Sequence, residues 1–415
     1  MSTTRRERVF SGIQPTGEIH LGNWLGAVKK WVEICATHDC IYCVVDDHAL
    51  TSDFDPAAMP RLTFDAVLTT MACGLDPERC AVFVQSHVPE HTELCWLFDA
   101  VTPLGSLFRM TQFKEKSRNA LLRALQREGG AQGTALHQLR NTGERADELV
   151  AEIRPELVRL DPAGTPDETA AERVNDRLGE LMQALQVGLG VAEASAGLFT
   201  YPVLQAADIL LYKATLVPVG EDQEQHLELA REIAERFNRR FGELFPATRR
   251  LPGEAPRILG LDGRRKMSKS LGNQIGVLDP AAVVEKKLAG AFTDPQRQRR
   301  TDPGRPEVCN IFSLHGYFTP EAERDELACA CRGAQIGCFD CKKRLAAGIN
   351  AALDPIRERA RALQAHPSIV LEALDAGAGH CRQIARGTMD EVRDAMGISR
   401  RLLAAAAEQR NPPGP

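Results

Sequence analysis

Two separated segments of this sequence carry residue types that handle phosphate groups. Residues 14–17 read Gln-Pro-Thr-Gly and are followed by His20 and Asn23, while residues 266–270 read Lys-Met-Ser-Lys-Ser. Splitting ATP between its α and β phosphates places negative charge on pyrophosphate, which two lysines on a mobile loop can stabilise. A turn that opens a helix presents backbone N–H groups to phosphates. Together the two segments predict an enzyme that activates its substrate with ATP.

Length and charge limit the class of protein further. The chain has 415 residues, a formal net charge of −5 and an isoelectric point near 6.1. A chain of this length exceeds what one hydrophobic core usually fills, so we expect at least two domains. The negative charge excludes a protein that coats nucleic acid indiscriminately, but it allows a local basic face that contacts one RNA.

The sequence predicts a cytoplasmic protein. Its charged N-terminus, with Arg5, Arg6, Glu7 and Arg8, is followed by no apolar stretch of the kind found in signal peptides. No run approaches the ~18 apolar residues of a membrane span. We therefore expect no membrane segment, and we expect the twelve cysteines to serve packing, redox chemistry or metal binding rather than disulfides.

The first 118 residues alternate apolar strands with helices. Strands are predicted at 9–12, 41–45 and 81–85, and helices at 21–34 and 61–73. Strands without polar alternation, separated by helices, imply a Rossmann-like, doubly wound parallel sheet that is covered on both faces. In such sheets ligands bind at the carboxyl ends of the strands, where Gly12 and Gln14 fall.

Residues 119–194 have a different texture. They are rich in Arg, Glu, Gln and Ala, and are interrupted by Gly129-Gly130 and by the turn at 161–164. Residues 165–168 form a capping box with Pro166 at the first helical position, and apolar residues follow at helical spacing. This pattern predicts a helical insertion with a solvated outer face. A partly disordered surface extension is the alternative.

The α/β pattern returns at residue 195. Residues 201–212 predict the start of a helix, 216–219 a strand, and 220–226 the opening of another helix. The first of these helices carries one acid, Asp208, among apolar residues. An acid in the interior must be paired or functional, because an unpaired buried charge is costly. Asp208 is therefore either part of a buried ion pair or an acceptor for a substrate ring N–H.

These segments carry a family resemblance that covers most of the chain outside 119–194. The segments at 10–17, 45–49, 109–117, 201–212, 217–223 and 266–270 resemble those of the bacterial tryptophanyl-tRNA synthetases, which are class I aminoacyl-tRNA synthetases. The resemblance implies that ATP is surrounded by Gly12, Gln14, Pro15, Thr16, Gly22, Asn23, Gly220, Glu221, Asp222, Ile258, Lys266, Met267, Ser268, Lys269 and Ser270. It implies a tryptophan pocket made by Phe10, His48, Tyr201, Gln205, Asp208, Val217, Val219 and Gln223.

The resemblance also implies a mechanism and partners. Asp208 would accept the indole N–H and Gln223 would hold the amino-acid end. The ionised tryptophan carboxylate attacks the α-phosphorus itself, so the protein aligns it and stabilises the transition state without a strong base. The residues implied to do so, with Mg²⁺, are His20, Asn23, Lys114, Lys266, Ser268 and Lys269. The aminoacyl group would then pass to the 2′-hydroxyl of the terminal adenosine of tRNA(Trp). Relatives are homodimers, which we expect here as well.

Three features depart from the family pattern. Gln205 stands where many members have methionine against the indole, which predicts a more polar pocket. Asn23 replaces the second histidine of the His-Ile-Gly-His signature, so no role for a histidine pair carries over. The insertion lies beside the region that contacts the acceptor stem in relatives, and could touch tRNA or a partner protein.

Four cysteines late in the chain are candidate ligands of a metal group. Cys309, Cys331, Cys338 and Cys341 have the spacing Cys-x21-Cys-x6-Cys-x2-Cys. Some tryptophanyl-tRNA synthetases carry a [4Fe–4S] cluster in their anticodon-recognition domain with similar spacing, one residue longer in the first gap. Zinc is the competing metal, although structural zinc sites more often show two close pairs, and unliganded buried cysteines are the third reading. Cys329 could substitute for Cys331.

A second Cys-x2-Cys pair, Cys40 and Cys43, lies inside an apolar strand, where alternate side chains face opposite sides. Buried packing is the better interpretation of that pair.

Basic residues flank the late cysteines and favour contact with RNA phosphates, with a solvated helix face as the alternative. They are Arg297, Arg299, Arg300, Arg305, Lys342, Lys343 and Arg344. The predicted organisation is a catalytic domain in two halves at 1–118 and 195–285, the insertion at 119–194, a helical anticodon-recognition domain at 286–398 and a flexible tail at 399–415.

Two other function classes share part of these signals. A nucleotidylyltransferase of the same superfamily would share the ATP segments but would not need Asp208 in an indole-type pocket. A non-catalytic paralogue, acting as a tryptophan or redox sensor or as a partner-binding protein, would lose part of the catalytic loop. The presence of Lys266, Ser268 and Lys269 favours activity.

Overall fold

The computed structural model describes residues 6–52, 54–111, 148, 151–152, 176, 195–220, 223–251 and 258–410. The chain divides into two compact units, one made of Met1–Val101 with Val203–Pro415 and the other of Thr102–Pro202. Within the predicted insertion, residues 148, 151, 152 and 176 are described, and all four are helical.

The first unit is built on a five-stranded parallel sheet, which confirms the predicted fold class. Its strands are β1 (Arg8–Ile13), β2 (Asp39–Val44), β3 (Ala81–Val84), β4 (Leu216–Val217) and β5 (Arg249–Arg250), in the order β3-β2-β1-β4-β5. β1 and β2 pair from Arg8 with Asp39 to Ile13 with Val44. Continuous apolar runs explain the central strands, because β2 is buried along nearly its whole length. Cys40 and Cys43 are both buried within it, as the packing interpretation predicts.

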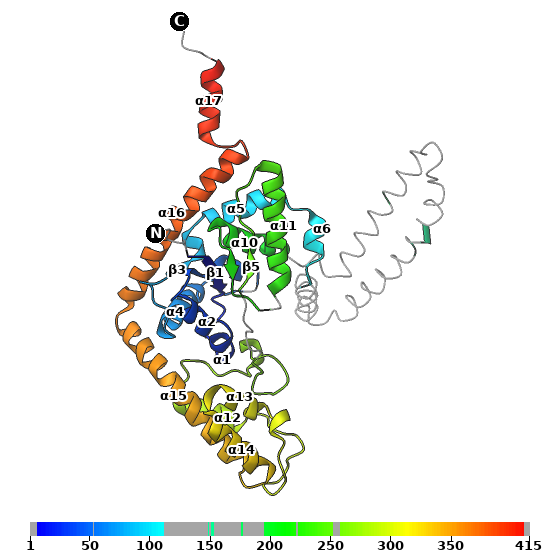
Figure 1. Ribbon diagram of the computed structural model, residues 1–415, viewed down its shortest axis with the longest axis vertical. Coiled ribbons are helices and arrows are strands. Elements are labelled where there is room, and N and C mark those ends of the chain that lie inside the picture. Colours follow the sequence, from blue (N-terminus) through cyan, green and yellow to red (C-terminus); the bar gives the residue numbers. More distant parts are fainter. Residues whose placement is uncertain are drawn as a thin grey trace. The chain divides into compact units, whose positions relative to one another are not determined.

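Helices surround the sheet and continue into a long C-terminal series (Figure 1). They are α1 (Leu21–Asn23), a π-helical turn (Trp24–Val28), α2 (Lys29–Ile34), α3 (Asp46–Ala49), α4 (Met59–Ala72), α5 (Glu90–Asp99), α6 (Leu104–Phe108), α10 (Ala196–Leu211), α11 (Glu224–Phe241), α12 (Ala281–Ala289), α13 (Asn310–Phe318), α14 (Glu321–Arg332), α15 (Cys338–Ala365), α16 (Pro367–Ala395) and α17 (Arg400–Arg410). No helix among the described residues combines the length and apolar character needed to cross a bilayer.

The helix predicted at 21–34 forms, but its second turn is π-helical. His20 caps the helix: its Nδ1 accepts the backbone N–H of Asn23 at 3.3 Å, and Asn23 Oδ1 accepts the N–H of His20 at the same distance. The π-helical turn follows directly from Trp24 to Val28. Such turns inside α-helices are frequent at functional sites.

Helix α10 begins five residues earlier than the sequence predicts. A proline is favoured in the first turn of a helix, so Pro202 suggests a start at Tyr201. In the structure Ser195 supplies the cap, since its hydroxyl accepts the N–H of Leu198 at 3.1 Å, and Pro202 lies inside the helix. A cap contributes about 1 kcal/mol and an internal proline costs about 3 kcal/mol, so the burial of apolar side chains such as Leu198 and Tyr201 must also support this first part of the helix.

The C-terminal helices pack back onto the sheet. α15 lies against α4, and α16 lies against β3 and α5 (Figure 1). Within the segment predicted as a flexible tail, residues 400–410 form the helix α17. Ser399 caps this helix by accepting the N–H of Leu402 at 3.3 Å, and the leucines and alanines that follow favour helix.

Gly377 permits the contact between α16 and the edge strand β3. A Cβ atom at Gly377 would lie 2.0 Å from the carbonyl oxygen of Val82 and 3.0 Å from its nitrogen. The helix backbone therefore touches the strand backbone directly and covers the open edge of the sheet, where an unpaired strand would otherwise invite aggregation.

Gly377→Ala should destabilise the protein by about 1–3 kcal/mol, because backbone atoms cannot move aside as a flexible side chain could. Gly379→Ala is the matched control: it lies in the same helix with nothing within 4 Å of its added Cβ. It should stabilise by up to ~1 kcal/mol through helix propensity. Denaturant unfolding of the two variants measures both changes, and equal midpoints would contradict the close approach.

Candidate active site

A cavity of about 710 Å³ opens beyond the carboxyl end of β1. Its walls come from the loop after β1, from the capped helix start and from the distant loop at 266–270. The lining residues are Gly12, Ile13, Gln14, Thr16, Gly17, Glu18, Ile19, His20, Asn23, Ala27, Trp31, Ser268 and Lys269. The structure thus brings together around one space the two phosphate-handling segments that the sequence separates.

The helix start and the 266–270 loop touch at Gly22. A Cβ at Gly22 would meet the His20 ring at 3.0 Å and the Met267 Cβ at 3.5 Å. The tight contact is the one with His20, so glycine at this position leaves room for the ring of the capping histidine, while Met267 packs at ordinary contact distance. Pro15, which belongs to the same predicted ATP set, is buried in the loop between β1 and the helix.

The imidazole of His20 is held in its neutral form. Burial, and next the positive charge of Lys266, lower the pKa of His20 from 6.5 to about 4. A neutral ring agrees with the capping geometry, because His20 Nδ1 must accept the N–H of Asn23. At neutral pH the positive charge of this site therefore comes from its lysines.

The His20 ring should titrate in the free protein with a midpoint of about 4, as followed by the pH dependence of its NMR signal. Lys266→Ala should raise the midpoint, because it removes a cation that disfavours the imidazolium, whereas Lys269→Ala should not. The folded state rejects a proton that the unfolded chain binds, so the stability contribution of His20 is present above pH 6.5 and is lost as the pH falls toward 4. A midpoint near 6.5 in the wild type would contradict the burial of this ring.

The loop at 266–270 is anchored at its first residues and exposes its lysines. Leu259 and Lys266 form an antiparallel bridge, and the N–H of Met267 donates to the carbonyl of Ile258 at 2.9 Å. Met267 is buried, whereas Lys266 and Lys269 are exposed. The backbone of Ser270 continues the turn.

Lys269 reaches across to the loop after β1. Its Nζ lies 3.4 Å from the carbonyl of Thr16, and a Cβ at Gly17 would collide with the ammonium group. Gly17 has a φ of +139°, which favours glycine. The backbone at 16–17 and Lys269 thus face each other across the cavity.

Asn273 braces this loop, a role that the sequence does not reveal. Its Oδ1 accepts the N–H of Ser268 at 2.8 Å, and its Nδ2 donates to Asp262 at 3.1 Å and to the carbonyl of Lys266 at 3.4 Å. The only sequence signal is the pair Gly272-Asn273, in which Gly272 takes the left-handed conformation with φ +62°.

Asp208 is the centre of a second group of polar residues. Its Oδ2 lies 2.9 Å from His48 Nε2, and its Oδ1 lies 2.7 Å from Gln85 Nε2 and 2.6 Å from His91 Nδ1. His48 follows β2 in α3, Gln85 follows β3, and His91 lies in the first turn of α5. The carboxylate on α10 is thus buried and paired, as one of the two sequence interpretations predicts.

The ionisation of Asp208 is set by these neighbours. Burial alone would raise the pKa of Asp208, but hydrogen bonds from His48 and His91 outweigh burial and hold the pKa below its ordinary value. The group is therefore a carboxylate at neutral pH and can only accept hydrogen bonds.

Gln85 and His91 are the residues of this group that sequence reasoning missed. They are 123 and 117 residues from Asp208 in the chain. Both are fully buried. The available signal was their position after strand β3, at the edge where the carboxyl ends of parallel strands meet.

The other predicted substrate residues lie on neighbouring elements. Phe10 on β1 stacks on Tyr212 with ring centroids 5.5 Å apart, and Val217 is buried at the end of β4. Gln205 is half-buried on α10. Gln223 precedes α11, where its Oε1 lies 3.0 Å from His226 Nδ1. The carbonyl of Val219 accepts a hydrogen bond from Arg250, and the carbonyl of Gly220 accepts the N–H of Gln223. Tyr201 is buried and belongs to the other compact unit.

Three predicted site residues lie outside the described part of the chain. They are Lys114, Glu221 and Asp222.

The four late cysteines lie near one another but do not form a site for a single metal ion. Burial, and next the charges of Cys309, Cys331 and Cys338, raise the pKa of Cys341 to about 12. Within the described ranges, no group of three or more His, Cys, Asp or Glu side chains is arranged to hold a metal ion. The predicted metal site is therefore not confirmed. Cys329 is exposed, unlike the other four.

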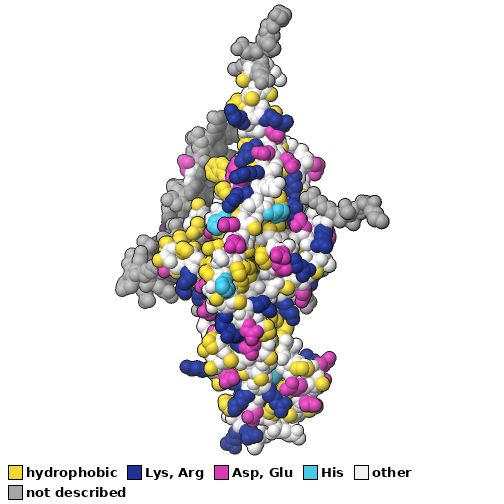
Figure 2. Space-filling model, turned by 90° about the vertical axis from the view of Figure 1, so that its left-hand side faces the viewer, with side chains coloured by type: hydrophobic (Ala, Val, Ile, Leu, Met, Phe, Trp, Pro, Cys, Tyr) yellow, Lys and Arg dark blue, Asp and Glu magenta, His cyan; other side chains and the backbone are white. Residues whose placement is uncertain are grey.

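Three of the seven basic residues predicted to face RNA are engaged within the protein. Arg297 is buried, Arg305 forms an ion pair of 2.6 Å with Asp294, and Lys342 donates to the carbonyls of Ala289 and Ala291. Arg300 and Arg344 lie 3.9 and 3.8 Å from Asp340 and Glu323, respectively. In the part of the chain that is described, Arg299 and Lys343 have no carboxylate within 4 Å. Figure 2 shows the same mixing on one face, where positive and negative side chains alternate.

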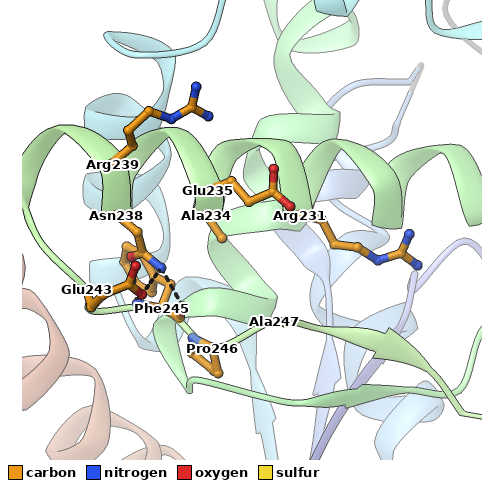
Figure 3. Close-up of a pocket in the computed structure, with 9 residues that line it drawn as sticks. All are labelled: Arg231, Ala234, Glu235, Asn238, Arg239, Glu243, Phe245, Pro246 and Ala247. Carbon is orange, nitrogen blue, oxygen red and sulfur yellow. Dashed lines mark hydrogen bonds between the residues drawn. The ribbon is translucent and has the colours of Figure 1, made fainter.

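A hollow beside α11 contains none of the predicted residues (Figure 3). It is lined by Arg231, Ala234, Glu235, Asn238, Arg239, Glu243, Phe245, Pro246 and Ala247. Asn238 donates to Glu243 at 3.0 Å and to the carbonyl of Phe245 at 2.8 Å, so its amide closes the chain turn after α11. This hollow has the polar contacts of a helix end rather than those of a catalytic site.

The parallel sheet, the capped helix start and the Lys-Met-Ser-Lys-Ser loop around one cavity define a class I synthetase. The chain belongs to that family: the model described as tRNA synthetases class I (W and Y) matches residues 1–126 and 171–354. Among similar relatives are the tryptophan–tRNA ligases of Deinococcus radiodurans, 42% identical over 94% of this chain and 98% of the relative, and of Aquifex aeolicus, 38% identical over 94% and 100%.

A solved structure is similar over the same extent. It is the tryptophanyl-tRNA synthetase of Campylobacter jejuni complexed with ADP and tryptophan, which is 29% identical, has a TM-score of 0.70, and is matched over 94% of this chain and 99% of that chain.

Proposed function

We propose that this chain is a tryptophan–tRNA ligase that converts L-tryptophan and ATP to tryptophanyl-adenylate and pyrophosphate, then transfers the tryptophanyl group to tRNA(Trp). The observation that carries the proposal is the single cavity that joins the 12–23 segment to Ser268 and Lys269. Relatives named tryptophan–tRNA ligase, 34–42% identical over nearly their whole length, support it.

The activation step needs alignment and charge stabilisation rather than a base. The tryptophan carboxylate oxygen forms a bond to the α-phosphorus, and the bond from that phosphorus to the β-phosphate bridging oxygen breaks. Lys266 and Lys269 would stabilise the leaving pyrophosphate, while the neutral His20 and Asn23 would position the phosphates. Magnesium enters with ATP as the counter-ion of the substrate. Lys114, Glu221 and Asp222 keep their proposed places in the ATP site, on the strength of the sequence resemblance.

The amino-acid end of the site would be built around Asp208. A carboxylate has about four acceptor positions, and three donors from the protein occupy this one, so one position remains for the indole N–H. Phe10, Val217 and Val219 would supply apolar walls, Gln205 and Tyr201 would contact the ring, and Gln223 would hold the ammonium end. The bound ADP and tryptophan of the C. jejuni enzyme support a nucleotide site and an amino-acid site in one fold.

Amino-acid-dependent exchange of pyrophosphate into ATP, measured across all twenty amino acids, tests the activation step. Exchange with tryptophan alone is expected, and charging of tRNA(Trp) by the same preparation tests the transfer step. Exchange with no amino acid would favour the sensor or partner-binding paralogue instead.

We also propose that Cys309, Cys331, Cys338 and Cys341 hold a [4Fe–4S] cluster. The support is a buried cation: Arg297 Nη1 lies 3.4 Å from Cys331 Sγ, and Arg297 Nε has no hydrogen-bond partner among the described residues. A buried guanidinium needs negative charge, which thiolates around a cluster would supply. Thiols around one zinc ion would sit about 3.8 Å apart, given Zn–S of ~2.3 Å. Within the described ranges no group of side chains has such an arrangement, so the proposal depends on the spacing of the cysteines and on Arg297.

Cys338→Ser should remove the brown absorption and the iron of protein purified without oxygen. It should impair tRNA charging more than pyrophosphate exchange. Cys329→Ser is the matched control, because Cys329 is the exposed neighbour and should keep both iron and colour. Wild-type protein without iron, or loss of iron in both variants alike, would overturn this ligand set.

The tRNA-binding face would use the cations that remain available. Lys343 Nζ lies 4.6 Å from the centre of the exposed Phe339 ring, beside Lys286 in a groove of about 320 Å³. Such pairs of ring and cation suit unpaired bases and phosphates. We further propose a cytoplasmic homodimer, which cell fractionation and sedimentation would test.

A further inference from the structure

A chain of buried hydrogen bonds leads from Asp208 through His91 to Tyr212. His91 Nδ1 lies 2.6 Å from Asp208 Oδ1, and His91 Nε2 lies 2.7 Å from the hydroxyl of Tyr212. The thiol of Cys381 on α16 interacts electrostatically with the Tyr212 hydroxyl. His91, Tyr212 and Cys381 are all fully buried.

Aromatic rings enclose this chain. Phe10 stacks on Tyr212 with centroids 5.5 Å apart, and Phe83 stacks on His91 at 5.6 Å. Phenylalanine side chains have no hydrogen-bonding atoms. The two nitrogens of His91 therefore have Asp208 and Tyr212 as their hydrogen-bond partners.

The direction of the donors follows from the carboxylate. Asp208 only accepts, so the proton of His91 lies on Nδ1, and Nε2 of the neutral ring must accept the O–H of Tyr212. Without that hydroxyl, a buried Nε2 would lack a donor, and the ring could move its proton from Nδ1 to Nε2. A phenol behind a histidine thus fixes the histidine tautomer, as a carboxylate does in a catalytic triad.

The arrangement leaves one defined acceptor position. Oδ1 of Asp208 receives two donors, from Gln85 and His91, whereas Oδ2 receives one, from His48. The unused position is therefore on Oδ2, on the His48 side.

We propose that Tyr212, acting through His91, is a positioning residue that fixes the free acceptor of Asp208 and thereby selects an amino acid whose ring carries an N–H. This inference rests on the proposed function. Tyr212 touches neither substrate. Its effect is to keep His91 on Oδ1, so that Oδ2 stays free for the substrate.

Tyr212→Phe removes the hydroxyl and keeps the ring. The test compares pyrophosphate exchange with tryptophan and with 3-(benzothiophen-3-yl)alanine, which has sulfur in place of the N–H. We expect kcat/KM to fall about 10-fold for tryptophan and less than about 2-fold for the analogue, with the KM for ATP unchanged.

Tyr42→Phe is the matched control. Tyr42 is the other fully buried large tyrosine, and its hydroxyl donates to the carbonyl of Trp31 at 3.0 Å, away from Asp208. Its loss should leave the ratio between the two substrates as in the wild type. ¹⁵N NMR of His91 supplies a second readout, because the ring should be the Nδ1–H tautomer in the wild type and a mixture of the two tautomers in Tyr212→Phe.

Each outcome decides the matter. An equal fall for tryptophan and analogue, or an unchanged ratio with an unchanged His91 spectrum, would overturn the positioning role while leaving the proposed function intact. A wild-type protein that activates neither compound would overturn both. If Tyr212→Phe is too unstable to assay, the wild-type ¹⁵N spectrum decides, because a His91 ring that carries a proton on Nε2 would overturn the positioning role.

Discussion

Asp208→Asn should reduce kcat/KM for tryptophan by about 10²–10³ while changing the KM for ATP less than about 3-fold. The carboxylate accepts hydrogen bonds from His48, Gln85 and His91, and offers a fourth position to the indole. An amide has one oxygen and turns two donors toward groups that themselves donate. Buried donors would then lose their acceptor, which costs roughly 1–3 kcal/mol for each unsatisfied group.

The control for this change is Asp294→Asn. Asp294 is also a buried aspartate, and it pairs with Arg305 at 2.6 Å in the C-terminal part of the chain. Its substitution should lower stability without altering the preference for tryptophan. Steady-state exchange kinetics on both variants separate the two effects. Parallel loss of tryptophan and ATP affinity in Asp208→Asn would mean that Asp208 supports the fold rather than the amino-acid site.

The sequence made the phosphate side of this site predictable because its signals are local. The turn at 14–23 and the loop at 266–270 each carry their chemistry within a few residues. Parallel strands with helices between them place the turn at the carboxyl edge of the sheet. Local signals could not show that Asn273 holds this loop in place. Its side chain hydrogen-bonds to Ser268 and Asp262, and these partners come together only in the folded chain.

The amino-acid side was only half predictable. Asp208 stood out because an acid in an apolar helix needs partners, but nothing in the sequence identified them. Gln85 and His91 belong to the connection after β3, and only the strand order β3-β2-β1-β4-β5 brings that connection to α10. Their neighbours in sequence are ordinary polar residues of a turn and a first helical turn.

Charge counting along the chain predicts the available cations of the C-terminal part only in part. Seven basic residues near the late cysteines suggest an RNA-binding face when they are read along the chain. In three dimensions Arg305 meets the carboxylate of Asp294, and Lys342 meets the carbonyl group of Ala289. The spacing of charges along a helix does not reveal these partners, because the partners lie 11 and 53 residues away.

Lys269→Ala should slow adenylate formation by about 10²–10³, with the KM for tryptophan changed less than about 3-fold. Its ammonium group lies over Gly17 and 3.4 Å from the carbonyl of Thr16, at the edge of the cavity. Negative charge grows on the pyrophosphate only as the α–β bond breaks, so this cation acts on the transition state more than on the bound substrates. The expected signature is therefore a fall in kcat rather than a rise in KM.

Arg264→Ala is the control for Lys269→Ala. It tests whether the rate of adenylate formation depends on where the positive charge lies or only on the net charge of the protein. Arg264 is an exposed cation in the segment before the loop, where its guanidinium lies 5.7 Å from the centre of the Phe292 ring and does not line the cavity. Both variants change the net charge equally, so a long-range field would slow both. If only the charge at the cavity matters, Arg264→Ala keeps its rate, and Lys269→Arg recovers part of the loss because it restores the charge without the compact ammonium. Equal rates in Lys269→Ala and the wild type, measured by single-turnover adenylate formation, would remove this lysine from the mechanism and leave Lys266 as the loop's cation.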